Sequence, residues 1–172
     1  VAYWTINLSG QSLGDKSLLA AITGAIKRWD LEPRLLMFEI TETAAVANLV
    51  EARTFIAELR GLGCRFALDD FGSGLSSFAY LKNLNIDCLK IDGMFVRDAL
   101  ADPVDQAIVR SSNEVGHLLG LTTVAEFVET DEVLQRIRSI GVDYAQGYGI
   151  ASPMPLDEVL EHDGFRSRTE RC

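Results

Sequence analysis

The stretch Leu62-Gly63-Cys64-Arg65-Phe66-Ala67-Leu68-Asp69-Asp70 contains the features that decide the fold. Gly63 follows an apolar helical stripe and can take the left-handed conformation that ends a helix. The apolar run that follows is typical of a strand buried on both faces in a parallel sheet. Asp69 and Asp70 close that run. The stretch therefore predicts a helix, a tight turn, a buried strand and a pair of carboxylates.

The same arrangement recurs along the chain. Gly120 and Gly141 also follow helical apolar stripes. We expect strands near residues 3–8, 35–40, 65–69, 88–91, 122–125 and 144–146. We expect helices over 15–29, 44–62, about 76–82, 104–119 and 133–140, the last capped by Thr130. Strands that alternate with helices in this way predict an α/β fold with a parallel sheet.

Polar residues close most of the apolar runs: Asn7, Glu39, Asp69 with Asp70, Lys90, Glu126 and Gln146. In a closed barrel all carboxyl strand ends meet at one mouth, whereas an open sheet gathers ligand groups at one switch point. The polar ends therefore favour a TIM-like (β/α)8 barrel. A complete barrel has eight strands in about 250 residues, so this chain supplies about six of the eight strand–helix units. No Gly-x-Gly-x-x-Gly follows the first strand, which argues against a dinucleotide cofactor.

Composition narrows the function further. The formal net charge of −9 argues against a nucleic-acid polymer as partner, because phosphate-tracking surfaces are basic. A hydrophobic content of 48% fits a single domain over residues 1–172. We expect no membrane insertion by these residues, since no apolar stretch reaches the length of a span. Cys64 and Cys88 lie beside apolar runs, which predicts core thiols in a reducing cytoplasm; the parent protein can still be membrane-anchored.

The clustered acids point to a metal site. Asp69 and Asp70 would repel each other unless cations lay between them. The chain has two histidines, which argues against a histidine-rich zinc site. Oxygen ligands instead favour a hard cation, Mg²⁺ or Mn²⁺.

Six strings carry a resemblance to a known family: NLSGQSL (7–13), FEITET (38–43), LDDFGSGLSS (68–77), LKIDGMFV (89–96), VAEFVET (124–130) and AQGYGIASPMP (145–155). Together they resemble the EAL family of bacterial phosphodiesterases, which linearise cyclic di-GMP. The resemblance implies the barrel fold, two bound divalent cations (Mg²⁺ or Mn²⁺), hydrolysis of cyclic di-GMP to linear pGpG and a homodimer. It is compatible with sensory or GGDEF-type domains upstream of Val1.

The resemblance also assigns residues by position. Those that match metal ligands are Asn7, Glu39, Asp69, Asp70 and Glu126. Asp69 matches the ligand that bridges the two cations. Lys90 matches a lysine that orients the attacking water, and with Asp70 and Glu126 it makes up the catalytic set.

Other matched positions surround the metals. Gln146 and Asn7 match substrate-binding positions. The residues assigned to stabilising the Asp-Asp-Phe-Gly loop and its surroundings are Glu42, Gly72, Gly74 and Glu129. In the family this loop couples dimerisation to metal occupancy.

The chain departs from the family pattern in one large respect. The Glu-Ala-Leu signature does not occur upstream of Asn7. Its glutamate is a metal ligand in the family, so we expect an N-terminally incomplete domain with weak or no hydrolysis by itself. Leu75 stands where the family often has tyrosine, and Phe127 where it often has glycine.

Simpler interpretations exist for each residue taken alone. Asn7 fits a turn, Glu39 and Glu42 fit helix N-terminal acids, and Lys90 with Asp92 fits an exposed ion pair. The main alternative function is a receptor that binds cyclic di-GMP without cleaving it. A third is a carboxylate-rich barrel of the enolase-like or glycoside-cleaving kind.

Overall fold

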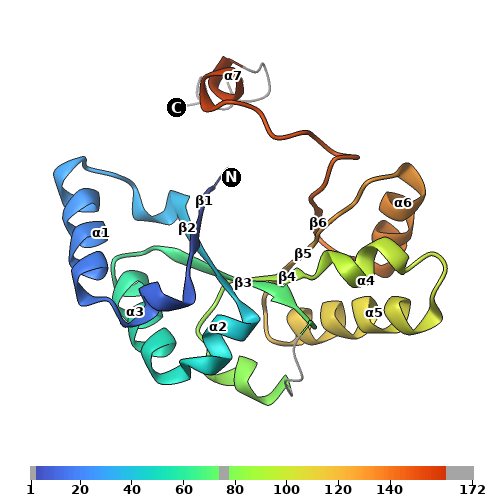
Figure 1. Ribbon diagram of the computed structural model, residues 1–172, viewed down its shortest axis with the longest axis horizontal. Helices are drawn as coiled ribbons and strands as arrows, with labels where there is room; N and C mark the ends of the chain where they lie inside the picture. Colours follow the sequence, from blue (N-terminus) through green and yellow to red (C-terminus); the bar gives the residue numbers. More distant parts are fainter. Residues whose placement is uncertain (1–2, 74–77, 162–172) are drawn as a thin grey trace.

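A computed structural model describes residues 3–73 and 78–161 of the chain (Figure 1). Its strands form one parallel sheet in the order β1-β2-β3-β4-β5-β6. Their bounds are β1 (Trp4–Leu8), β2 (Leu36–Thr41), β3 (Arg65–Phe71), β4 (Cys88–Ile91), β5 (Thr122–Ala125) and β6 (Tyr144–Ala145). The predicted α/β fold is confirmed, and each strand boundary lies within two residues of its expected position.

Helices cover the outer side of the curved sheet, and α7 stands apart from them (Figure 1). The α-helices are α1 (Lys16–Arg28), α2 (Glu42–Ala47), α3 (Leu49–Gly61), α4 (Gly93–Asp98), α5 (Pro103–Leu118), α6 (Asp131–Ile140) and α7 (Leu156–Glu161). Short 3-10 helices are η1 (Gly10–Gly14), η2 (Pro33–Leu35) and η3 (Phe78–Asn83). The helix-ending role of the glycines is confirmed, because Gly63, Gly120 and Gly141 have φ of 103°, 74° and 91°.

Alternation along the strands separates the core from the site. Phe38 on β2 and Phe66 on β3 point outward, with ring centroids 5.6 Å apart, and pack in the core that the helices cover. Met37, Ala67 and Cys88 belong to a separate buried cluster. Since side chains two positions apart share a face, Glu39, Asp69 and Lys90 lie on the same inner face as this cluster.

The helix expected over 44–62 is in fact two helices, α2 and α3, which Asn48 separates. Thr41 Oγ1 accepts a hydrogen bond from Ala44 N at 3.3 Å, so α2 already begins at Glu42. Asn48 has φ −132° and ψ 49°, and its side chain donates to Ala44 O. Asparagine side chains compete with the helix backbone in this way, which favours a break.

Three shorter elements also differ from expectation. The helix expected over about 76–82 is the 3-10 helix η3, and residues 76–77 lie outside the described part. The helices α4 and α7 were not anticipated. Both are only six residues long, too short to produce a clear helical periodicity.

The two outer strands differ from the inner ones. Among the described residues β1 pairs only with β2, and β6 only with β5. Trp4 and Ile6 on β1 are each 41% exposed as a result. Within the same residues we find no helix with the length and apolar character needed to cross a bilayer.

We predict opposite effects for one substitution at two glycines. Gly141→Ala should lower the free energy of unfolding by about 1–2 kcal/mol, because its left-handed backbone disfavours a Cβ. The nearest atom to that Cβ is 3.9 Å away, so no clash contributes. Gly24→Ala, inside α1 with open space around it, should stabilise by about 0.5–1 kcal/mol. Urea unfolding measures both, and equal effects would contradict the assignment.

Candidate metal and active site

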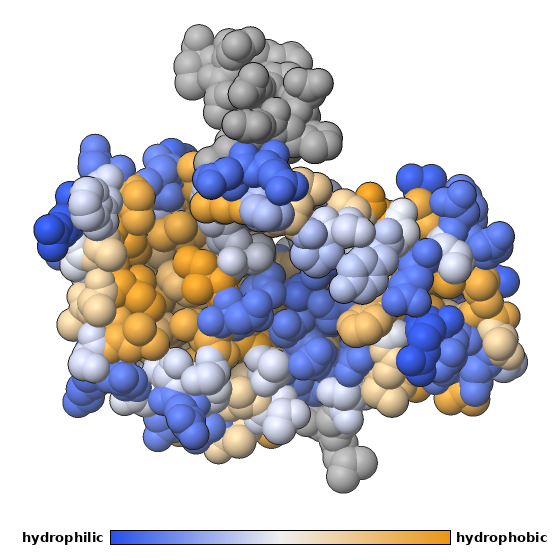
Figure 2. All heavy atoms as spheres, turned by 45° about the horizontal axis from the view of Figure 1, so that its top comes forward, coloured by the Kyte–Doolittle hydropathy of each residue, from blue (hydrophilic) through white to orange (hydrophobic). Residues whose placement is uncertain are grey.

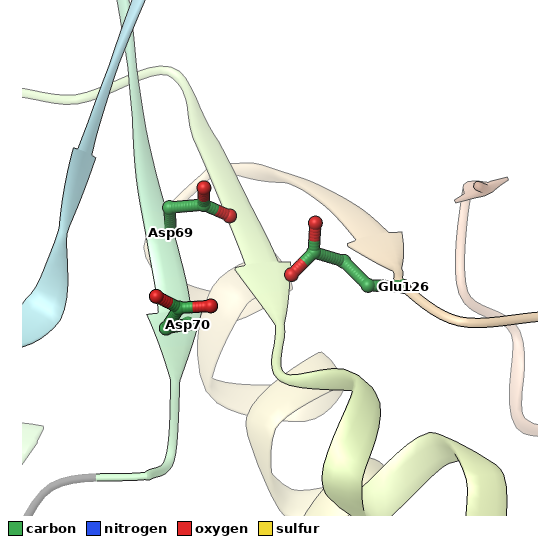
Figure 3. Close-up of side chains that lie close together, drawn as sticks. All are labelled: Asp69, Asp70 and Glu126. Carbon is green, nitrogen blue, oxygen red and sulfur yellow. The ribbon is translucent and has the colours of Figure 1, made fainter. Parts of the chain in front are cut away.

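The parallel register brings the polar strand ends to one edge of the sheet. Asn7 on β1 pairs with Glu39 on β2, and Thr41 on β2 pairs with Asp69 on β3. Lys90 lies on β4, and Glu126 directly follows β5. Residues up to 119 positions apart in the chain therefore meet at one mouth of the sheet. In Figure 3 the carboxylates of Asp69, Asp70 and Glu126 point toward one another.

A β-bulge places both aspartates at this mouth. Leu68 pairs with Leu89 and Phe71 with Ile91, so three steps along β3 match two along β4. Asp70 takes the left-handed region at φ 53°. Consecutive residues of a regular strand point to opposite faces, and the extra residue of a bulge re-aims a side chain. The bulge thus lets Asp70 join Asp69.

Lys90 is the cation at the centre of the site. It is 5% exposed, and its Nζ lies 3.0 Å from Glu39 Oε2, 2.8 Å from Asp69 Oδ1 and 2.8 Å from Glu126 Oε1. Burial by itself would lower the pKa of Lys90. The ion pairs with Asp69 and Glu126 outweigh burial and raise the pKa of Lys90 above its ordinary value. Lys90 therefore carries a positive charge throughout the physiological range.

Negative charge exceeds this single cation. Burial, then the charges of Asp69 and Asp70, raise the pKa of Glu126 to about 7 against the opposing effect of Lys90. Burial and the charges of Asp69 and Asp92 also raise the pKa of Asp70. Asp69 Oδ1 is buried and lies 2.8 Å from Lys90 Nζ in an ion pair, but within the described residues no contact to it has hydrogen-bond geometry. The site thus has spare acceptors and needs more positive charge.

These oxygens fit a hard divalent cation. Asp69, Asp70 and Glu126 each offer an oxygen, and the three atoms lie within 4.8 Å of one another. Carboxylate oxygens are the ligands that Mg²⁺ and Mn²⁺ prefer. Binding would neutralise the charge that raises the pKa of Glu126.

Glu42 connects the loop after β3 to its surroundings. This side chain is 2% exposed at the start of α2. Its Oε2 accepts from Gly72 N at 3.0 Å, and its Oε1 accepts from the Tyr80 hydroxyl at 2.5 Å. Gly72 has φ 101°, which only glycine adopts readily. Gly74 and Leu75, also singled out by the sequence, lie outside the described residues.

The remaining assigned residues lie around the cluster. Glu126, Phe127, Glu129 and Gln146 line one cavity, which Tyr148 borders. Gln146 also lines a second cavity, on the inner face of the sheet, together with Glu39 and Lys90. The side chains of Glu129 and Gln146 are exposed, as is that of Asn7 beside Glu39 in the register. Phe127 is 58% exposed, and its ring covers Gly93 so closely that a Cβ there would lie 2.1 Å from it.

Figure 2 shows one face of the molecule. Hydrophilic side chains gather in its middle, and hydrophobic side chains lie to their left. Trp4 and Ile6 on β1 are exposed apolar residues. The β1 edge of the sheet therefore carries apolar surface.

Two contributors were missed from the sequence. Tyr80 donates to Glu42, but a single tyrosine in a short 3-10 helix gives no signal by itself. Asp92 affects Asp70 through its charge and caps α4 by accepting from Met94 N at 2.9 Å. Asp92 lies two residues after Lys90 at the end of β4, and this position in the sequence could have indicated that it belongs near the site. Lys90 is buried and pairs with other carboxylates, so the interpretation of Lys90 and Asp92 as an exposed ion pair is wrong.

Comparison with known proteins gives a consistent result. A family model described as "EAL domain" matches residues 2–153. The chain is 45% identical over 157 residues to the cyclic di-GMP phosphodiesterase PdeB of Shewanella oneidensis, covering 91% of this chain and 18% of that protein. It is 38% identical over 157 residues to the cyclic di-GMP phosphodiesterase PdeF of Escherichia coli, covering 91% and 21%.

A solved structure shows the same fold. The PaMucR phosphodiesterase in complex with c-di-GMP superposes with a TM-score of 0.87 and 34% identity. The match covers 92% of this chain and 64% of that one. The chain spans about a fifth of the length of PdeB and PdeF, 18% and 21% respectively.

We predict that the metal-free protein loses stability as pH rises from 5 to 7.5. Glu126 has a folded pKa of about 7 against an ordinary 4.5, so between these values the folded state binds more protons than the unfolded state. The free energy of unfolding of the protein should therefore fall by about 2 kcal/mol between pH 5 and 7.5. Urea unfolding in the presence of a chelator measures this. Glu126→Gln should reduce the slope, and an unchanged slope would contradict the assignment.

We also predict that Tyr80→Phe destabilises the protein by about 1.5–3 kcal/mol, because a buried carboxylate loses a hydrogen-bond donor. Tyr148→Phe is the matched control. Tyr148 is 68% exposed, so removal of its hydroxyl should change stability by less than about 0.5 kcal/mol. Thermal and urea unfolding compare the two variants. A Tyr80→Phe effect as small as that of the control would mean that the bond to Glu42 contributes nothing.

Proposed function

This chain belongs to the EAL domain family, and we propose that it is the phosphodiesterase part of a longer protein that hydrolyses cyclic di-GMP to linear pGpG. The observation that carries the proposal is the oxygen cluster of Asp69, Asp70 and Glu126 around the buried Lys90. The names of its relatives PdeB and PdeF support the substrate. We further propose that residues 1–172 form one domain of that protein.

We propose that two divalent cations, Mg²⁺ or Mn²⁺, bind at this mouth. The proposed ligands share the carboxyl ends of β1, β2, β3 and β5: Asn7, Glu39, Asp69, Asp70 and Glu126. When bound, such a pair supplies positive charge for the phosphate and lowers the pKa of a bound water. The excess of carboxylates over Lys90 supports the fit, because without added charge the site would repel an anionic substrate.

Lys90 is the proposed catalytic cation. Glu39, Asp69 and Glu126 lie within 3.0 Å of its Nζ and come from three different strand ends, so its charge is fixed in place. A fixed ammonium stabilises the negative charge that grows on phosphate oxygens in the transition state and can orient a water by hydrogen bonding. Because the raised pKa keeps Lys90 protonated, it acts as a hydrogen-bond donor rather than as a base.

Other residues are proposed to shape the substrate site. Gln146 and Asn7 would contact substrate, and the cavity that Gln146 shares with Glu126 supports this role. Glu42 would stabilise the loop through Gly72. The same proposal includes Gly74 and Glu129 around that loop, a homodimer, a cytoplasmic location and sensory or GGDEF-type domains in the parent protein.

The test uses the full-length protein with cyclic di-GMP and Mg²⁺ or Mn²⁺. Asp69→Asn removes the most central carboxylate and should lower turnover to pGpG at least about 100-fold. Glu58→Gln, an exposed acid on α3, should leave turnover unchanged. Activity that survives Asp69→Asn would contradict the assigned site.

A second experiment separates an enzyme from a receptor. Calorimetry without metal, followed by addition of Mn²⁺, distinguishes the two. A receptor would bind cyclic di-GMP tightly with no cation and never release pGpG. The proposed enzyme should convert it once the metal is present.

A further inference from the structure

Two similar polar clusters lie at the amino ends of the strands, opposite the candidate site. In the first, Asp87 directly precedes β4. Its Oδ2 accepts a hydrogen bond from Phe66 N on β3 at 2.9 Å and forms an ion pair with Arg60 of α3. We call Arg60, Phe66 and Asp87 the β3–β4 clasp.

The second cluster repeats the first two strands later. Asp143 directly precedes β6, and its Oδ2 accepts from Thr123 N on β5 at 2.8 Å. His117 of α5 places its Nε2 3.0 Å from the same oxygen. His117 precedes Thr123 by six positions, as Arg60 precedes Phe66. We call His117, Thr123 and Asp143 the β5–β6 clasp.

We propose that His117 and Asp143 are positioning residues for the β5–β6 side of the active site, and that their hold weakens as His117 loses its charge. This inference rests on the proposed phosphodiesterase function. His117 and Asp143 lie at the amino ends of the strands, opposite the proposed metal site. Substrate binding would depend on them through the positions of Glu126 and Gln146.

The position of the β5–β6 clasp explains its importance. Glu126 follows Thr123 by three residues, and Gln146 follows Asp143 by three. At about 3.3 Å per residue, both side chains lie about 10 Å along the strands from the clasp. Glu126 and Gln146 line the same cavity, so the relative height of β5 and β6 sets their spacing.

Apart from the clasp, a short ladder and the backbone bonds of Gln146 fix that height. The strand β6 has two residues, and its ladder consists of the pairs Val124–Tyr144 and Ala125–Ala145. Gln146 N donates to Ala125 O at 2.8 Å, and Gln146 O accepts from Val128 N at 3.0 Å. The strand β4, in contrast, pairs with a neighbour on each side. Loss of a clasp should therefore affect β6 far more than β4.

The two clasps differ in their cation. Arginine stays charged, whereas histidine changes charge between about pH 5 and 8. The Thr123 hydroxyl lies 2.6 Å from Asn113 Oδ1 and 3.1 Å from Asp143 Oδ2, and its single hydrogen can be donated to only one of them at a time. Thr123 N–H and His117 are the other donors to Asp143. A neutral imidazole donates from Nε2 in only one tautomer and without charge. The β5–β6 clasp should therefore loosen at high pH.

The surroundings of His117 contain few other charges. Asn113 on α5 and Thr123 on β5 are its neutral neighbours in the network. Glu114 lies one turn earlier on α5, and Arg138 of α6 lines a cavity with Asp143. The side chains of His117 and Asp143 are 42% and 38% exposed. Solvent therefore weakens the pair, and a moderate effect is expected.

Hydrogen exchange read by mass spectrometry tests the clasp without relying on activity. In the metal-free full-length protein, peptides that contain Gln146 should lose about fivefold in protection between pH 6 and 8, after correction for intrinsic exchange. Peptides that contain Asp87, whose N–H is bonded to Phe66 O at 2.8 Å, report the change in overall stability that Glu126 causes and should lose less protection. His117→Arg should reduce the pH dependence of the Gln146 peptides to that of the Asp87 peptides. Equal pH dependence of the two sets of peptides in the wild type would overturn the proposal.

A reciprocal variant keeps the test decisive if His117→Arg does not fold. Arg60→His should increase the pH dependence of protection in the Asp87 peptides and leave that of the Gln146 peptides as in the wild type. The proposal is wrong if neither substitution changes the pH dependence of the peptides at its own clasp.

Kinetics then connect the clasp to the site. Relative to His117→Arg, the wild type should show a KM for cyclic di-GMP that rises about fivefold from pH 6 to 8, with kcat changed less. Equal KM profiles together with the expected exchange pattern would show a purely structural clasp and overturn the positioning role. Absence of turnover in the wild type at every pH would instead count against the proposed function, whatever the exchange pattern.

Discussion

The Lys90 ammonium lies in a buried position between Glu39, Asp69 and Glu126, and the rest of the site depends on this contact. Desolvation of a lysine is costly unless carboxylates surround it, and these carboxylates come from three strands. Burial, together with the charges of Asp69 and Asp70, raises the pKa of Glu126 despite the lysine, and within the described residues no contact to Asp69 Oδ1 has hydrogen-bond geometry. The same charge imbalance that costs stability in the metal-free protein prepares the mouth of the sheet for divalent cations.

Departures from regular strand geometry give the site its shape. The bulge in β3 and the left-handed Asp70 bring adjacent carboxylates to one face. Phe127 is also left-handed and directly follows Glu126 at the end of β5. Such conformations are costly and persist where surrounding structure supports them. Here the support includes Glu42, which accepts from Gly72 just after the bulge. The loop and the metal ligands are thus parts of one unit.

The two ends of the sheet carry different kinds of polar contact. At the carboxyl ends, polar side chains converge on the candidate site. At the amino ends, Asp87 and Asp143 each accept a backbone N–H of the neighbouring strand and pair with Arg60 or His117 from the helix before that neighbouring strand. This follows from the repeated strand–helix unit, because each repeat places an equivalent residue at the same height. The repeat that carries histidine lies at β6, which has two residues and pairs only with β5 among the described residues.

The sequence by itself determined the order of strands and helices, the helix ends at Gly63, Gly120 and Gly141, and the set of polar strand ends. These features follow from local periodicity and backbone preference, which act over a few residues. Only the tertiary structure decided that Asn48 splits a helix, that Tyr80 reaches Glu42, that Asp70 turns to join Asp69, and that Asp143 meets His117. The break at Asn48 is local but involves a competition between side chain and backbone that periodicity does not reveal. The other outcomes depend on contacts between residues distant in the chain, or on a register shift between strands. Local sequence patterns do not encode such contacts, because packing selects them only after the sheet has formed.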